Sequence, residues 1–148
     1  MRKIQAALER NCYLKAFIYG LCISFLLFIP FILVDEGLFL FYGDFNVQQV
    51  PFYQMCHDAV RSGNVKWSWT TDLGANFVGS YSFYLLGSPF FWLTIPFPSE
   101  AVPYLMGPLL ILKFACASLT GTIFIRRYVK DSSSAVLGGL LYGFSGFS

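Results

Sequence analysis

Charge is the scarcest feature of this 148-residue chain, because only 12% of its residues are Asp, Glu, Lys or Arg. Soluble domains average about 25% charged residues. In contrast, 56% of the residues are hydrophobic and 20% are aromatic. This balance excludes a disordered chain and argues against an ordinary cytosolic enzyme. The net charge of +2 is also too small to indicate a nucleic-acid partner, so the composition predicts a membrane protein.

Motifs for several kinds of chemistry are absent as well. The four cysteines contain no CxxC pair, which argues against a thiol-redox or zinc site, and we interpret all four as small apolar residues. A single histidine, His57, excludes a multi-histidine metal site. The chain has no phosphate-cradling glycine loop, no nucleophile elbow and no nucleotide-binding βαβ unit.

The chain instead contains several long uncharged runs. Residues 16–34 carry no charge, and a helix of that length extends about 28 Å, close to the thickness of the hydrocarbon layer. No small-residue cleavage site ends this run, so we predict a retained membrane-spanning helix. Residues 101–125, interrupted only by Lys113, predict a second one. Residues 132–148 predict the start of a third, truncated helix, so we expect this sequence to be the front part of a longer, multi-pass protein.

Basic residues flank these runs and set the expected topology. They precede the first span and follow the second: Arg2, Lys3, Arg10 and Lys15, then Arg126, Arg127 and Lys130. Both clusters should face the cytoplasm, which requires an even number of crossings between them. The uncharged run 73–99 is rich in glycine and proline, so we predict a short or re-entrant helix there. The expected fold is an all-α polytopic membrane protein of the bacterial cell membrane, with a cytoplasmic N-terminus and an extracellular loop over residues 35–100.

The outer loop is acidic and contains one clear helical pattern. Its six acids and two basic residues give it a net charge of −4. Residues 51–62 predict an amphipathic helix, with Pro51 in its first turn and Gly63 as its C-terminal cap. One face would carry Phe52, Met55, Cys56, Ala59 and Val60, and the other Gln54, His57, Asp58 and Arg61. A packing element at the membrane surface is the simplest interpretation of this helix.

Asp44 is the residue in the loop most suited to catalysis. It follows Gly43 in a turn near the expected outer surface, where partial desolvation would raise the proton affinity of a carboxylate. It could then accept a proton from a sugar hydroxyl, although a solvated turn aspartate fits the same spacing. Trp67 and Trp69 also allow two interpretations, namely anchors at the membrane interface or a platform on which a sugar ring stacks.

Several short motifs resemble the YfhO family of bacterial membrane proteins. They are Gly43–Tyr53, Gly74–Phe77, Tyr84, Ser88–Phe90, Lys113 with Leu119–Gly121, and Tyr142–Gly146. Members of that family are longer, many-pass proteins. The resemblance implies a GT-C-type glycosyltransferase architecture that takes a sugar from a polyprenyl-phosphate carrier and transfers it to a cell-wall polymer such as teichoic or lipoteichoic acid. The family's aspartate in the first outer loop corresponds to Asp44, which implies that Asp44 is catalytic.

The resemblance and the residue chemistry together give a set of candidate substrate-binding residues: Gln48, Arg61, Lys66, Trp67, Trp69, Asn76 and Lys113. Arg61 and Lys66 are the cations available on the outer side for a phosphate. Lys113 would contact phosphate or a buried acid, or else snorkel toward water. Asp35, Glu36 and Asp44 could supply oxygen ligands, so a divalent cation is possible and the metal stays unassigned.

Two further interpretations stay open. The chain could be a non-enzymatic component of a membrane transporter or permease, or an inactive truncated remnant. Pairs of small residues at a spacing of four, Ala117 with Gly121 and Gly139 with Gly143, predict close approach between helices of the same protein. The partners expected in addition are membrane lipids, the carrier-linked sugar, the polymer acceptor and the missing C-terminal helices.

Overall fold

The computed structural model describes residues 2–39, 43, 45–69, 71, 73–81 and 85–145, with only the backbone for residues 2–10. The chain forms two compact units, one made of Met1–Pro30 with Leu109–Ser148 and the other of Phe31–Pro108. We call these unit 1 and unit 2. Two long helices, α1 (Arg2–Val34) and α5 (Val102–Ile125), contribute to both. Each boundary falls at a proline inside a long helix, Pro30 or Pro108, where a helical hydrogen bond is lost.

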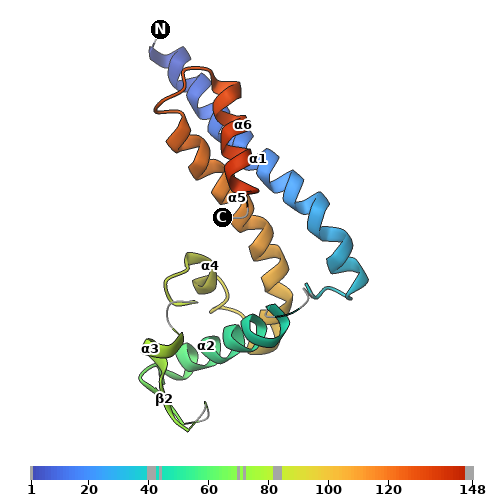
Figure 1. Cartoon of the computed structure of the whole chain (residues 1–148), viewed down its shortest axis with the longest axis vertical. Coiled ribbons are helices and arrows are strands. Elements are labelled where there is room, and N and C mark those ends of the chain that lie inside the picture. The colour runs from blue at the N-terminus through green and yellow to red at the C-terminus, as the bar shows by residue number, and fades with distance from the viewer. Residues whose placement is uncertain are drawn as a thin grey trace. The chain divides into compact units, whose positions relative to one another are not determined.

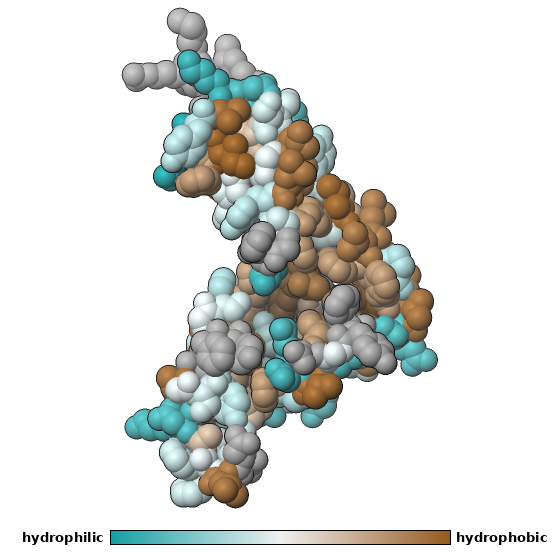
Figure 2. Space-filling model, in the orientation of Figure 1, coloured by the Kyte–Doolittle hydropathy of each residue, from teal (hydrophilic) through white to brown (hydrophobic). Residues whose placement is uncertain are grey.

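Both predicted membrane spans are helical. Asn11–Val34 and Ser99–Ile125 are long and apolar enough to cross a membrane. Figure 2 shows hydrophobic residues along α1, beyond the polar end where the N-terminus lies. A third helix, α6 (Ser132–Gly143), begins where the sequence predicts it. Because residues 146–148 lie outside the described residues, a third span stays a prediction.

Small residues determine how the helices of unit 1 pack, and Figure 1 shows the first part of α1, the last part of α5 and α6 running side by side. Gly121 on α5 and Gly139 on α6 are so close that a Cβ on Gly121 would lie 3.3 Å from the Gly139 Cα. A Cβ on Gly143 would lie 2.5 Å from the Ser118 Oγ. On α1, Gly20 approaches the same hydroxyl, with a Cβ position 2.8 Å away. The predicted close approach between helices of one chain is confirmed.

A side-chain cap and a small core fix the start of α6. Asp131 precedes the helix, and its carboxylate accepts a hydrogen bond from the Ser134 N–H at 2.7 Å. That bond lowers the pKa of the carboxyl group. Val136 then packs against Cys12 and Ala16 of α1. The first turns of α6 are therefore held both by their own cap and by α1.

Unit 2 contains short elements around a separate core. In chain order these are a π-helical turn η1 (Phe45–Gln49), α2 (Val50–Ser62), β1 (Trp67–Ser68), β2 (Ala75–Asn76), α3 (Phe77–Tyr81), α4 (Pro89–Trp92) and a 3-10 turn η2 (Ser99–Ala101). The two strands form a small antiparallel hairpin, a minor departure from the predicted all-α fold. The buried core consists of Cys56, Phe77, Tyr81, Leu85 and Phe91.

The glycine- and proline-rich run 73–99 forms no long helix. Its described helices are α3 and α4, which have five and four residues. Gly74, with a φ of +102°, and Pro89, at the start of α4, mark two of its turns. The predicted interruption of this run is therefore confirmed. Re-entry into the membrane stays a prediction.

Candidate functional site

Helix α2 is the scaffold on which the candidate site of unit 2 is built. It begins at Val50 with Pro51 in its first turn, and it ends at Gly63, whose φ of 74° suits glycine. The N–H groups of Gly63 and Asn64 bond to the last turn of the helix, at 3.2 and 2.9 Å. The predicted apolar face packs against the core of unit 2. The amphipathic helix predicted from the sequence is thus confirmed.

His57 departs from the prediction, because it is fully buried and not on the polar face. Its Nε2 lies 3.0 Å from the carbonyl oxygen of Phe97, and Arg61 Nη1 donates to the same oxygen at 2.8 Å. A carbonyl oxygen can only accept, so the His57 Nε2 must carry a proton. The two side chains therefore fasten α2 to the segment that leads into α5. Arg61 has a structural partner here, although it is exposed and keeps further N–H donors.

The side chains of Trp67 and Trp69 contact each other on the hairpin. Trp67 and Trp69 meet edge to face, with ring centroids 5.7 Å apart and an angle of 64° between the ring planes. Gly74 leaves room for the Trp67 side chain, because a Cβ on Gly74 would lie 3.2 Å from the indole ring of Trp67. Trp69 is left with 79% of its surface exposed. The contact with Trp67 therefore orients the Trp69 ring, while most of that ring stays exposed to solvent.

Trp69 lines a surface groove of about 670 Å³ in unit 2. Met55, Ala59 and the buried Phe77 provide its apolar lining. Its polar lining comes from Asp58, Ser62, Asn64 and Ser68. A groove of this size is within the usual range for small-molecule sites. An exposed aromatic ring beside hydroxyl, amide and carboxylate groups matches the two sides of a sugar ring, one apolar and one rich in hydroxyls.

The charge of the groove favours a neutral ligand. Among the described residues that line the groove, Asp58 is the one with a charged side chain, and this side chain is 61% exposed. The Asp58 Oδ1 lies 3.5 Å from Nδ1 of His57. Because a carboxylate has two acceptor oxygens, Asp58 can still accept a hydrogen bond from a ligand hydroxyl. The described lining contains no cation that could offset the charge of a phosphate. The groove therefore suits an uncharged saccharide better than a phosphate.

The other candidates among residues 35–100 lie outside this groove. Asn76 pairs with Trp67 in the hairpin, and its Oδ1 accepts a hydrogen bond from the Gly79 N–H at 2.8 Å. It therefore holds the start of α3. Gln48 is exposed in the π-helical turn η1. Lys66 is exposed directly before Trp67, and its backbone oxygen accepts from Phe77 N–H at 3.2 Å.

Two further predictions fall elsewhere. Lys113 belongs to unit 1, where it is exposed on α5 and lines a cavity of about 40 Å³ with Leu110, Phe114 and Ala117. Within the part of the chain that the structure describes, it has no ion-pair partner. Asp44, the predicted base, lies outside the described residues. Among the described residues no three His, Cys, Asp or Glu side chains form a metal-binding group, and the divalent cation stays a prediction.

Two ionisable side chains of α2, Tyr53 and Cys56, are made less reactive by burial. Burial raises the pKa of the Cys56 thiol to about 12 and also raises the pKa of the Tyr53 hydroxyl. Tyr53 packs edge to face on Phe91, with ring centroids 5.6 Å apart. Both groups stay protonated near neutral pH, so neither supplies a nucleophile or a general base.

Sequence reasoning missed most of the polar groove residues. Asp58 and Ser62 are one helical turn apart on α2, and Gly63 reverses the chain so that Asn64 follows them. The spacing of Asp58 and Ser62 beside the glycine cap could have indicated a common face. The approach of Ser68 could not be seen, because it depends on the hairpin.

A family model described as bacterial membrane protein YfhO matches residues 16–148, which is about nine-tenths of the chain. No curated protein and no solved structure matches the chain.

Proposed function

Since the chain belongs to the YfhO family of bacterial membrane proteins, we propose that it works as a membrane-embedded glycosyltransferase of the GT-C type. The family resemblance seen in the sequence is confirmed by the match. In this proposal the enzyme takes a sugar from a polyprenyl-phosphate carrier. It transfers that sugar to a cell-wall polymer such as teichoic or lipoteichoic acid on the outer face of the membrane.

The groove beside Trp69 is the observation that carries the proposal. It offers an oriented aromatic face, one exposed carboxylate and three neutral polar side chains in about 670 Å³. Stacking on Trp69 would cover the apolar face of a sugar ring, while Asp58 and Asn64 bond to its hydroxyl groups. A transporter component would also bind sugar, but a transferase additionally requires a base.

Asp44 is the proposed base, and the proposed step is a displacement at the anomeric carbon. The acceptor hydroxyl oxygen bonds to that carbon and gives its proton to the Asp44 carboxylate. The bond between the anomeric carbon and the carrier phosphate breaks, and its electron pair leaves with the phosphate. Cations must stabilise the departing phosphate. Lys66 is exposed in unit 2, and Arg61 keeps donors beyond its bond to Phe97.

The proposal requires loop 35–100 to be outside the cell. The basic residues before α1 and after α5 support this orientation through the preference of such residues for the cytoplasmic side. The carrier's lipid tail would then stay in the membrane while the sugar reaches unit 2. Lys113 lies within the apolar span of unit 1, and its contact with a phosphate stays a separate prediction that the groove of unit 2 does not require.

Substitution of Trp69 tests the proposal. Trp69→Ala should lower sugar transfer to the polymer about tenfold, the loss expected when an aromatic contact worth ~1.5 kcal/mol is removed. Trp69→Phe keeps a ring and should retain most of the activity. Leu73→Ala changes a fully exposed residue of the same hairpin and serves as the control. Equal transfer by all three variants, at equal amounts in the membrane, would refute a sugar site at this groove.

A further inference from the structure

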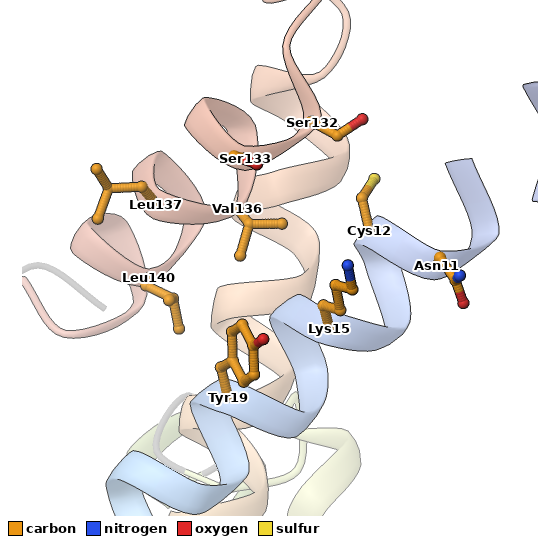
Figure 3. A pocket seen from close by; sticks show the side chains of 9 residues that line it. All are labelled: Asn11, Cys12, Lys15, Tyr19, Ser132, Ser133, Val136, Leu137 and Leu140. Carbon is orange, nitrogen blue, oxygen red and sulfur yellow. The ribbon is translucent and has the colours of Figure 1, made fainter. Parts of the chain in front are cut away.

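A second cavity, of about 350 Å³, lies in unit 1 between α1 and α6. Figure 3 labels the nine residues that line it, four from residues 11–19 of α1 and five from residues 132–140 of α6. In this view Lys15 and Tyr19 rise from α1 on the side toward α6. This cavity belongs to unit 1, whereas the groove proposed for sugars belongs to unit 2.

The lining changes from polar to apolar along the two helices. In Figure 3 Ser132 lies at one end of the cavity and Leu140 farther along α6, while α1 passes the cavity from Asn11 to Tyr19. Lys15 and the serine hydroxyls of Ser132 and Ser133 belong to the first part, and Leu137 and Leu140 to the second. Asn11 marks the start of the apolar span, so the polar part lies where a membrane headgroup region would be. An amphiphile with a polar head and an apolar chain matches this gradient.

The charge at this end of unit 1 favours an anionic head. Residues 1–15 and 126–131 together contain seven basic residues and two acidic ones. Lys15 is exposed, and among the described residues it has no ion-pair partner. Its amine is therefore available to a ligand phosphate, and a lysine amine binds phosphate as a compact charge with three donors.

The helix N-terminus itself is already occupied and does not form the site. Asp131 caps α6 through the Ser134 N–H, and its carboxylate would repel an anion placed on the same amides. The contacts to a phosphate must therefore come from Lys15 and from the side-chain hydroxyls. An inorganic phosphate would use only those groups and leave the apolar half of the cavity in contact with water. A phospholipid fills both halves.

We propose that this cavity binds an anionic phospholipid from the leaflet in which α1 and α6 begin. The lipid phosphate lies at Lys15, near the hydroxyls of Ser132 and Ser133. One acyl chain follows Tyr19, Leu137 and Leu140 toward the middle of the membrane. This site is independent of the proposed sugar transfer.

Native mass spectrometry of the protein, released from nanodiscs with equal amounts of phosphatidylglycerol and phosphatidylcholine, tests the proposal. The unaltered protein should retain phosphatidylglycerol in preference to phosphatidylcholine. Lys15→Gln should reduce that retention about fivefold, the effect expected for one basic residue at a membrane surface. Lys15→Arg should retain the preference. Lys130→Gln removes an exposed charge from the same end without touching the cavity and should change retention little.

Leu137 and Leu141 provide a matched pair of substitutions that tests the apolar half of the cavity. Leu137 lines the cavity, whereas Leu141, one turn farther along α6, does not, and both are largely exposed. Leu137→Ser should weaken retention of both lipids, and Leu141→Ser should not. Equal retention of the two lipids by the unaltered protein would overturn the proposal, as would equal losses in Lys15→Gln and Lys130→Gln. Inorganic phosphate added at millimolar concentration should not displace the lipid, and displacement would show a simple anion site.

Discussion

Replacement of Gly139 by alanine is the sharpest test of the packing in unit 1. A Cβ at this position would overlap the Thr122 Oγ1, and it would lie 2.6 Å from the Thr122 nitrogen and 2.7 Å from the Ser118 oxygen. The last two are backbone atoms of α5, so no side-chain rotation relieves the contact. The helices must separate, and part of the buried contact between α5 and α6 is lost.

The neighbouring Gly138 provides a matched control. A Cβ there would lie 2.8 Å from the Ile125 Cδ1, the flexible end of a side chain. Both substitutions change intrinsic helix propensity equally, by about 1 kcal/mol in favour of alanine. Overpacking lowers stability by about 1–3 kcal/mol. Because rigid backbone faces the new Cβ, we expect Gly139→Ala to lower the stability of the contact between α5 and α6 by about 3 kcal/mol. Gly138→Ala should be neutral or slightly stabilising.

Labelling of Cys12 measures the difference. This thiol is buried against Val136 of α6, so it becomes reactive when α6 moves away. In a protein that retains Cys12 as its single cysteine, Gly139→Ala should speed labelling about 100-fold, since ~3 kcal/mol corresponds to roughly two powers of ten. Gly138→Ala should leave the rate nearly unchanged. Equal rates in the two glycine variants would refute the packing argument.

Four other outcomes are expected. Ser118→Ala should slow Cys12 labelling or leave it unchanged, because the buried Ser118 hydroxyl has no hydrogen-bond partner in the described part of the chain and its removal relieves about 1 kcal/mol. Cys56 should be alkylated at pH 9 at least ~100-fold more slowly in the folded protein than after denaturation, because burial raises its thiol pKa to about 12. The same shift predicts that stability falls as pH rises from about 9 toward 12, where the unfolded thiol loses its proton first; a Cys56→Ala variant should lack this part of the pH dependence. A cysteine introduced at Asn64 should react with an impermeant reagent added to intact cells, and reaction only after the cells are opened would contradict the outer location of unit 2.

Much of the helical framework could be predicted because it depends on local chemistry. The uncharged runs locate α1 and α5, since a long apolar stretch has few alternatives to a helix in lipid. Pro51 and Gly63 bound α2 through their own backbone preferences. The glycine spacing on α6 indicated a close helix contact, because small residues at that interval lie on one face.

The site depends on contacts that local chemistry does not determine. His57 was expected on the polar face of α2, yet its partner is a carbonyl oxygen forty residues away at Phe97. Arg61, which was expected to bind phosphate, donates a hydrogen bond to the same oxygen and so has a structural role. Trp69 was predicted to bind substrate and does line a groove, but this groove forms only when the hairpin brings Ser68 and Trp69 to α2. Long-range pairing of this kind leaves no periodic signal in the sequence.

Sugar transfer by an Asp44→Asn variant tests the proposed function most directly. The variant should be measured in cells whose membrane contains it in the same amount as the unaltered protein, by the sugar content of the cell-wall polymer. Loss of a general base predicts a fall in transfer of at least ~100-fold, whereas Glu100→Gln, at an exposed acid of the same loop, should leave transfer near its normal level. Normal sugar content in the Asp44→Asn cells would contradict the account.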